Sequence, residues 1–256
     1  MTLATSPEEL AEMREELRAC GSVNQSDKVT LTLASDNGNS TALQSLGDTT
    51  AILTLHNPTA RNALTGQMMA QLADHVTTLE TNPALQKSLT AVLVRGGGDN
   101  PFFCAGADLG VAAQELGTKH GGKVMSAVMA DTTTRLRNLP YLTVACIEGG
   151  AVGGGAELAT ATDYRFMTKS AMVRFVQARM GVTPGWGGAT RLVQLVGRSK
   201  ALQVLGTAAP YDAEACVAMG LVDHVVDSSN DEDMDTHVVQ FLQCFVQEHP
   251  SWAAGR

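Results

Sequence analysis

The amino-acid sequence predicts an α/β fold. Short runs rich in valine, isoleucine and leucine recur along the chain, as expected for buried strands. Between them lie segments whose apolar residues repeat at helical spacing. Because strands and helices alternate, the expected architecture is a sheet covered by helices. The 256 residues, 44% of them hydrophobic and 17% charged, suffice for a large core.

The first part of the chain predicts a capped helix and then two strands. Ser6 precedes a proline and two glutamates, which is typical of a helix start, and this helix is expected to run to about Ala19. Residues 29–35 alternate between polar and apolar side chains and predict a strand, and residues 50–55 predict a second one. The stretch between them, 36–48, is rich in turn-forming residues.

The middle of the chain predicts two further helix–strand pairs. Residues 60–80 carry apolar side chains at helical spacing, and residues 89–96 form a buried strand. After a glycine-rich loop, residues 123–138 read as an amphipathic helix that Pro140 ends. Residues 141–149 then predict another buried strand.

The last part of the chain predicts short strands among several helices. A helix is expected from about Ala156, and Gly206 and Gly220 are expected to close two later ones, because glycine is common after a helix end. A charged turn and a final helix end the chain. The remaining predictions are strands at 164–168, 172–176 and 221–227 and helices at 185–197, 199–206 and 212–220.

Composition excludes several classes of function. The net charge is −8 and no Lys/Arg cluster occurs, which argues against a nucleic-acid partner. No apolar stretch is long enough to span a membrane. The five cysteines are dispersed and odd in number, and the N-terminus is acidic, so a reduced, cytosolic protein is expected. No metal-ligand spacing, phosphate-binding glycine motif or serine-hydrolase elbow occurs, so no metal or organic cofactor is implied.

Two glycine-bearing turns remain as the candidate site. They are 102–109, after the strand at 89–96, and 149–158, after the strand at 141–147. Ligands of α/β proteins bind at such strand ends, and glycine lets the backbone approach a ligand closely. A helix beginning near Ala156 would direct free N–H groups at the preceding glycines. With an N–H from the first turn, two donors could hold one oxyanion, although such turns can also serve packing alone.

Several segments, in order, resemble the successive signatures of the crotonase, or enoyl-CoA hydratase/isomerase, superfamily. The resemblance implies a spiral of ββα turns, trimers or dimers of trimers, and an acyl-CoA substrate whose thioester oxygen lies in an oxyanion hole. It also implies a spiral core at 1–200 with an N-terminal helical extension, and a helical oligomerisation segment at 201–256. The segments are LHNPTARNALTGQMM, FFCAGADL, GGAVGGGAELATATDYRF, MGVTPGWGGATRLVQLVG and AMGLVDHVV.

The resemblance also implies roles for individual residues. The oxyanion donors would be the N–H of Gly154 and that of Ala107 or its neighbour Ala105. Glu157 would lie beside the carbon next to the thioester, and Arg61 either contacts CoA phosphates or is a solvated cation. The predicted substrate-binding residues are Arg61, Ala105, Gly106, Asp108, Gly153, Phe175, Arg174 and Trp186.

The position of the second glutamate of family hydratases is occupied by Gln177. An amide cannot act as general acid or base, so two-carboxylate hydration is not expected. The chain is most similar to members that decarboxylate ethylmalonyl-CoA and methylmalonyl-CoA. That reaction needs an oxyanion hole and one proton donor, and Glu157 would either donate that proton or orient the substrate carboxylate. Gln177 would hydrogen-bond the leaving carboxylate, and Arg174 would either pair with it or face solvent.

The remaining predicted residues would shape the site without taking part in the chemistry. Two other functions also stay open. Trp186 and Phe175 would form apolar walls, and Asp108 is placed to cap the next helix. One alternative is a hydratase or isomerase that works with Glu157 alone. The other is a crotonase-fold protein that binds acyl-CoA without chemistry, which binding of CoA without turnover would reveal.

Overall fold

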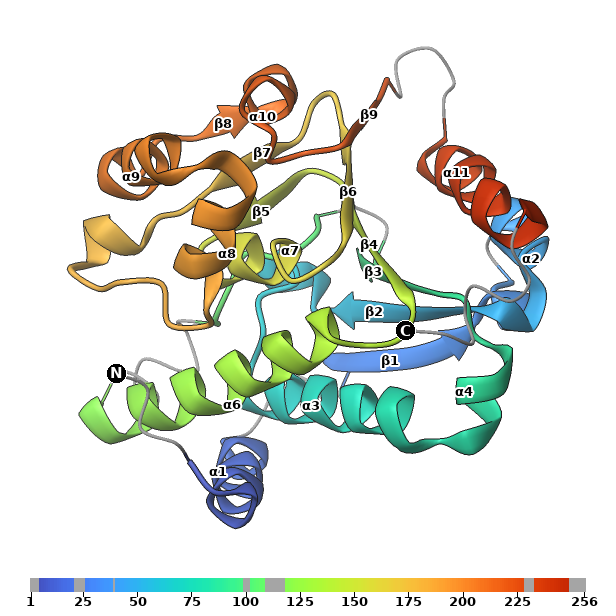
Figure 1. Cartoon of the computed structure of the whole chain (residues 1–256). Coiled ribbons are helices and arrows are strands. Elements are labelled where there is room, and N and C mark those ends of the chain that lie inside the picture. The colour runs from blue at the N-terminus through green and yellow to red at the C-terminus, as the bar shows by residue number, and fades with distance from the viewer. Residues whose placement is uncertain are drawn as a thin grey trace.

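Six strands form the main sheet, in the order β1-β2-β3-β4-β6-β9 (Figure 1). The first pair is antiparallel and the following pairs are parallel. The strands are β1 (Lys28–Leu33), β2 (Thr50–His56), β3 (Ala91–Gly96), β4 (Leu142–Ile147), β6 (Tyr164–Thr168) and β9 (His224–Val226). The structure is a computed structural model that describes residues 5–20, 26–38, 40–98, 102–108, 118–227 and 233–248. Residues 246–248 are described as backbone only.

A second, smaller sheet has the order β5-β7-β8. It consists of β5 (Gly150–Val152), β7 (Met172–Arg174) and β8 (Tyr211–Asp212). The chain passes from β4 to β5, and again from β6 to β7, through a few residues, so successive strands belong to different sheets. A helix follows β5 before the chain returns to the main sheet. This arrangement is the predicted ββα spiral.

Helices cover both faces of the main sheet. On one face, three helices pack against one another: α1 (Pro7–Ala19), α3 (Gly66–Thr81) and α6 (Lys119–Arg137). A second group, α2 (Thr41–Gln44) and α11 (Met234–Glu248), packs together away from these three (Figure 1). Alternate residues of β3 belong to two separate apolar clusters. Burial on both faces explains why this strand reads as a continuous apolar run rather than an alternating one.

The predicted elements are present, with differences at their ends. Ser6 caps α1 in a reciprocal hydrogen-bonded box with Glu9, as expected. The helix expected from Ala156 instead begins at Gly154 and spans only six residues, and α9 continues through Gly206 to Thr207, with Ala208 as its C-cap. The other helices are α4 (Pro83–Ser88), α7 (Gly154–Ala159), α8 (Gly188–Val196), α9 (Arg198–Thr207) and α10 (Ala213–Met219).

Three of the five cysteines are buried in the fold. Burial raises the pKa of the thiols of Cys104, Cys146 and Cys216 to about 12. Cys244, on α11, is exposed. We expect iodoacetamide at about pH 8 to alkylate Cys244 in the folded protein and the buried three only after denaturation. Peptide mapping by mass spectrometry checks this, and alkylation of Cys104 without unfolding would contradict it.

Candidate functional site

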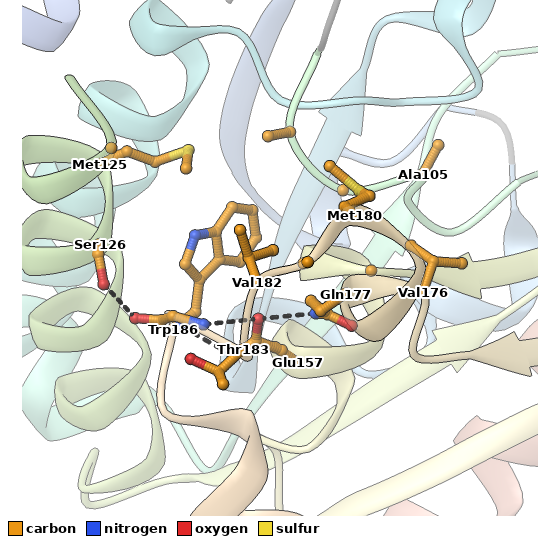
Figure 2. Close-up of a pocket in the computed structure, with 17 residues that line it drawn as sticks. Ala105, Met125, Ser126, Glu157, Val176, Gln177, Met180, Val182, Thr183 and Trp186 are labelled. Carbon is orange, nitrogen blue, oxygen red and sulfur yellow. Dashed lines mark hydrogen bonds between the residues drawn. The ribbon is translucent and has the colours of Figure 1, made fainter. Parts of the chain in front are cut away.

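Both glycine-bearing turns and Glu157 line one cavity of about 590 Å³ (Figure 2). Its walls come from the turn at 105–107, the start of α7, the 3₁₀ helix η4 (Gln177–Met180) with the loop that follows, and α6. Figure 2 shows Met125 and Ser126 of α6 on the side opposite Ala105 and Val176. The lining residues are Ala105, Gly106, Ala107, Gly122, Met125, Ser126, Gly153, Gly154, Glu157, Val176, Gln177, Met180, Gly181, Val182, Thr183, Gly185 and Trp186.

Backbone pairing brings the two glycine-bearing turns together. Cys104 forms a parallel bridge with Ala151 of β5: the N–H of Cys104 donates to Gly150 at 3.2 Å, and that of Val152 donates to Cys104 at 2.9 Å. Packing is so close that a Cβ on Gly155 would lie 2.1 Å from the Cys104 carbonyl oxygen. The turns, far apart in the sequence, therefore form one surface.

Two backbone N–H groups on this surface are available to a ligand. Leu64 bridges to Ala107 by donating to the Gly106 carbonyl and accepting from the N–H of Asp108, so the Ala107 N–H is directed to the other side. Gly154 is the first residue of α7, where N–H groups have no partner within the helix. Within the described residues, neither N–H donates to a protein acceptor.

The Ala105 N–H is already used, since it donates to the Arg61 carbonyl at 3.1 Å. Ala107 is therefore the better of the two donors that the sequence left open. The predicted oxyanion hole would consist of Ala107 and Gly154. Because α7 has only six residues, the predicted oxyanion hole depends on the two N–H groups themselves and not on the dipole of a long helix.

Glycines 153 and 154 are required for different reasons. Gly153 caps α7 with φ 57° and ψ −120°, a conformation that essentially only glycine adopts. Gly154 lies under the indole of Trp186, and a Cβ there would come within 2.4 Å of the ring. The first glycine turns the chain, and the second lets the indole pack directly on the backbone that carries the free N–H.

Glu157 is a fully engaged carboxylate at the base of the cavity. Its side chain is 2% exposed. One oxygen accepts from Nε2 of Gln177 at 3.0 Å and from the N–H of Gly185 at 3.2 Å. The other accepts from the N–H groups of Trp186 at 2.8 Å and Gly188 at 2.9 Å. The turn 185–188 therefore holds the carboxylate in one orientation.

Opposing effects act on the ionisation of Glu157. Burial raises the pKa of its carboxyl group above the ordinary value, and hydrogen bonds from Gly188, Trp186 and Gln177 and the charge of Arg191 oppose that rise. Arg191, on α8, donates to the carbonyls of Glu157 and Trp186 and to Thr160. Burial lowers the pKa of this guanidinium to about 10. Net, protonation of Glu157 is easier than for an exposed glutamate.

Gln177 is the other polar side chain beside Glu157. It is 7% exposed and lines the cavity from η4. Its Nε2 donates to Glu157, whereas its Oε1 is buried without a hydrogen-bond partner among the described residues. Glu157 is the only ionisable residue among those that line the described cavity. The site therefore offers one carboxylate and one amide.

Some predicted substrate-binding residues lie outside the cavity lining. Arg61 is exposed, with its guanidinium 5.7 Å from the centre of the Phe102 ring. Arg174 donates through Nε to the Ala208 carbonyl at 2.9 Å. Phe175 is fully buried in the core, and the helix that Asp108 was expected to cap lies outside the described residues. Ala105, Gly106, Gly153 and Trp186 do line the cavity.

Sequence reasoning missed the outer wall of the cavity. Met125 and Ser126 come from α6, and Ser126 donates to the Gly185 carbonyl at 2.7 Å. Met180, the last residue of η4, and Val182, just after it, are each 52% exposed and form part of this wall. In the sequence, the only available signal for this wall was a methionine and a valine on either side of a glycine. Their position beside Glu157 depends on how the loop folds back.

Two absences concern the described residues alone. In that part of the chain, no three His, Cys, Asp or Glu side chains are grouped so that they could hold a metal ion. Nor is any described helix both long enough and apolar enough to cross a membrane.

Comparison with known proteins gives consistent matches. The enoyl-CoA hydratase/isomerase family profile matches residues 46–254. Ethylmalonyl-CoA decarboxylase of Bos taurus is 40% identical over 213 residues, which cover 83% of this chain and 67% of the relative. The Homo sapiens protein of that name is 39% identical over 88% of this chain and 71% of its own. A putative enoyl-CoA hydratase from Thermobifida fusca, solved with acetoacetyl-CoA, superposes with a TM-score of 0.71 at 25% identity, covering 93% and 86% of the two chains.

Proposed function

The chain belongs to the enoyl-CoA hydratase/isomerase, or crotonase, family, and we infer that it decarboxylates ethylmalonyl-CoA, and also methylmalonyl-CoA. The relatives that share about 40% of its residues carry the name of this activity. The observation that carries the proposal is the pair of side chains in the cavity, Glu157 and Gln177. One carboxylate and one amide suit the loss of CO₂ better than the addition of water.

The proposed oxyanion hole stabilises the product of bond cleavage. When the bond between the α-carbon and the carboxylate breaks, its electron pair moves into the thioester, whose oxygen becomes an enolate oxygen. The N–H groups of Ala107 and Gly154 are placed to donate to that oxygen. One preorganised donor of this type contributes roughly 3–4 kcal/mol to the transition state.

The cavity would also destabilise the charged carboxylate of the bound substrate. Its described lining contains no lysine, arginine or histidine, and most of its residues are apolar or glycine. A carboxylate that enters it loses water without gaining a counter-charge. Departure as neutral CO₂ relieves that cost, provided the carboxylate stands out of the thioester plane.

Protonation of the α-carbon completes the reaction. Glu157 is the only ionisable side chain in the described lining, and its protonated form would donate the proton. A neutral Glu157 also avoids repulsion with the substrate carboxylate. Solvent then restores the proton for the next cycle.

Mass spectrometry of separate incubations with ethylmalonyl-CoA and crotonyl-CoA tests the proposal. We expect loss of CO₂ from ethylmalonyl-CoA to give butyryl-CoA, and no change in crotonyl-CoA. Hydration of crotonyl-CoA without CO₂ release would replace the proposal with a hydratase that uses Glu157 alone. Binding of both thioesters without turnover would indicate a non-catalytic acyl-CoA-binding protein.

The role of Glu157 predicts the pH dependence of the rate. Because the protonated form donates the proton, and burial raises its pKa, kcat should be full at low pH and fall as pH rises through that raised value. We expect this limb in the kcat profile with ethylmalonyl-CoA, and its loss in the residual activity of Glu157→Gln. An unchanged limb in that variant would assign the ionisation to another group.

We also propose that the protein acts as a homotrimer or a dimer of trimers and needs no metal or organic cofactor. The assembly rests on the resemblance noted in the sequence, and residues 201–256 as its oligomerisation segment rest on the same ground. The lack of a cofactor rests on the substrate, whose thioester already accepts the electron pair. Light scattering tests the assembly, and activity after chelation tests the second point. The cytosolic location stays a prediction.

A further inference from the structure

Ser126, on α6, makes its hydrogen bond outside its own helix. A serine or threonine inside a helix can donate to the carbonyl four residues earlier, and Thr132 and Thr134 of α6 do so. Ser126 instead donates to the carbonyl of Gly185, 59 residues away in the sequence, at 2.7 Å (Figure 2). This hydroxyl therefore holds the turn 185–188 rather than its own helix.

The bond from Ser126 acts on a peptide group that also binds Glu157. The carbonyl of Gly185 and the N–H of Trp186 belong to one planar trans peptide group, so they point in opposite directions. On one side the carbonyl accepts from Ser126, and on the other side the N–H donates to Oε2 of Glu157 at 2.8 Å. A chain of hydrogen bonds therefore leads from α6 to the carboxylate.

Ser126 is needed to fix this peptide group. Gly185 has no side chain, so its backbone turns easily, and a Cβ there would lie 3.0 Å from Oγ of Ser126. Ser126 is the only partner of the Gly185 carbonyl among the residues that the structure describes. The next carbonyl, that of Trp186, has two donors at 2.7 Å, Arg191 and Thr133. Loss of the Ser126 hydroxyl would therefore release one peptide group and leave its neighbour held.

Within such a chain, each hydrogen bond strengthens the next. A carbonyl that accepts a hydrogen bond makes the N–H of its own peptide group a better donor. A better donor favours an ionised carboxylate over a protonated one, because a hydrogen bond to a charged acceptor is stronger. The Ser126 hydroxyl therefore favours the ionised form of Glu157.

The charges around Glu157 stay in place when Ser126 is replaced. Arg191 of α8 is the charged group that acts on Glu157, and Arg137 of α6 acts in turn on Arg191. From η4, the neutral amide of Gln177 donates to Oε1. Among the residues that line the described cavity, neither α6 nor the turn 105–107 contributes a charged side chain. A change at Ser126 therefore alters the peptide group without altering a charge.

We propose that Ser126 is a positioning residue that acts on Glu157 through the peptide group between Gly185 and Trp186. It holds the N–H of that group toward the carboxylate and stabilises the carboxylate once its proton has left. The kinetic consequence rests on the proposed function, in which Glu157 gives its proton to the α-carbon and becomes ionised. There Ser126 makes Glu157 a stronger acid. The effect on ionisation needs no substrate.

Carbon-13 NMR of protein labelled at the glutamate carboxyl carbons tests the effect on ionisation. The signal of Glu157 is the one that Glu157→Gln lacks, and its titration midpoint is measured against pH. Burial already raises the pKa of this carboxyl group. Ser126→Ala removes a donor chain that favours the charged form, so the midpoint should rise further, by about half a pH unit. Ser126→Thr keeps the hydroxyl and should restore the midpoint of the unaltered protein.

Ser88→Ala is the matched control. Ser88, on α4, is exposed, and its hydroxyl donates to the Ala84 carbonyl of its own helix at 3.2 Å. This variant should leave the midpoint of Glu157 unchanged. Ser126→Cys gives a second test should alanine prevent folding, because a thiol has a similar size and is a weak donor. It should move the midpoint in the same direction as alanine.

Kinetics with ethylmalonyl-CoA test the consequence for the reaction. Ser126→Ala makes Glu157 a weaker acid, so kcat at low pH should fall about twofold. The fall of kcat with rising pH should move to higher pH by the same half unit or so, because Glu157 keeps its proton longer. A general loss of stability would not move this limb.

An unchanged or lower midpoint in Ser126→Ala would overturn the proposal, and so would an equal shift in Ser126→Thr or in Ser88→Ala. The release of CO₂ from ethylmalonyl-CoA is measured separately. A raised midpoint without CO₂ release would keep the role of Ser126 and refute the proposed function. CO₂ release with an unchanged midpoint would do the opposite.

Discussion

Replacement of Glu157 with glutamine should lower kcat for CO₂ release from ethylmalonyl-CoA by about 10²–10⁴-fold. The amide has no proton to give to the α-carbon. It also places an NH₂ group among the N–H groups of Gly185, Trp186 and Gly188, which in the unaltered protein donate to the carboxylate. Each buried donor left unpaired costs about 1–3 kcal/mol, so the variant should also unfold at a lower temperature. Steady-state kinetics and thermal unfolding measure the two effects.

Glu214→Gln is the matched control for this experiment. Glu214 lies in the first turn of α10, as Glu157 does in α7, but it is exposed. If Glu157 served only to stabilise the first turn of its helix, both variants would lose a similar, small amount of stability and neither would lose activity. That result would remove Glu157 from the proposed chemistry.

Replacement of Gly154 with alanine is the second change with a large expected effect. The new Cβ would lie 2.4 Å from the indole of Trp186, which is 3% exposed and packed in the core. Either the ring or the backbone must shift, and the backbone carries one of the two proposed oxyanion donors. We expect kcat to fall about 10²–10³-fold, the usual effect of losing such a donor. Kinetics with ethylmalonyl-CoA check this.

Gly206→Ala controls for the general effect of a methyl group at a helical glycine. Gly206 lies inside α9, and nothing lies within 4 Å of a Cβ placed there. Alanine there should leave kcat unchanged and stabilise the protein by about 0.5–1 kcal/mol. If Gly154→Ala kept full activity, Gly154 would be a packing glycine and the oxyanion assignment would need another donor.

Local signals in the sequence predicted most of the elements, and they were weakest at helix ends. Ser6 and the acids that follow it define a cap within four residues, so the start of α1 could be predicted to the residue. The end of α9 could not. Gly206 looks like a stop, yet the helix continues to Thr207 and is capped by Ala208 in a left-handed conformation (φ 48°). Alanine gives no sign of that conformation in the sequence.

The candidate site divides in the same way. Both glycine-bearing turns and Glu157 could be singled out because their signals are local and short. Arg174 could not be placed from the sequence, because its partner is the carbonyl of Ala208, 34 residues away. The cavity wall from α6, with Met125 and Ser126, depends on helix packing that no local pattern records.

Residue identities and short-range patterns were enough to predict most of the strands and helices, the family, and the presence of one acid and one amide where two acids could stand. Each of these depends on residue identity or on short-range periodicity. The folded structure was needed to show that Ala107 rather than Ala105 offers a free N–H, that the turn 185–188 surrounds Glu157, and that Gln177 Oε1 has no partner among the described residues. Those facts depend on which backbone groups already have partners, and long-range pairing sets the partners.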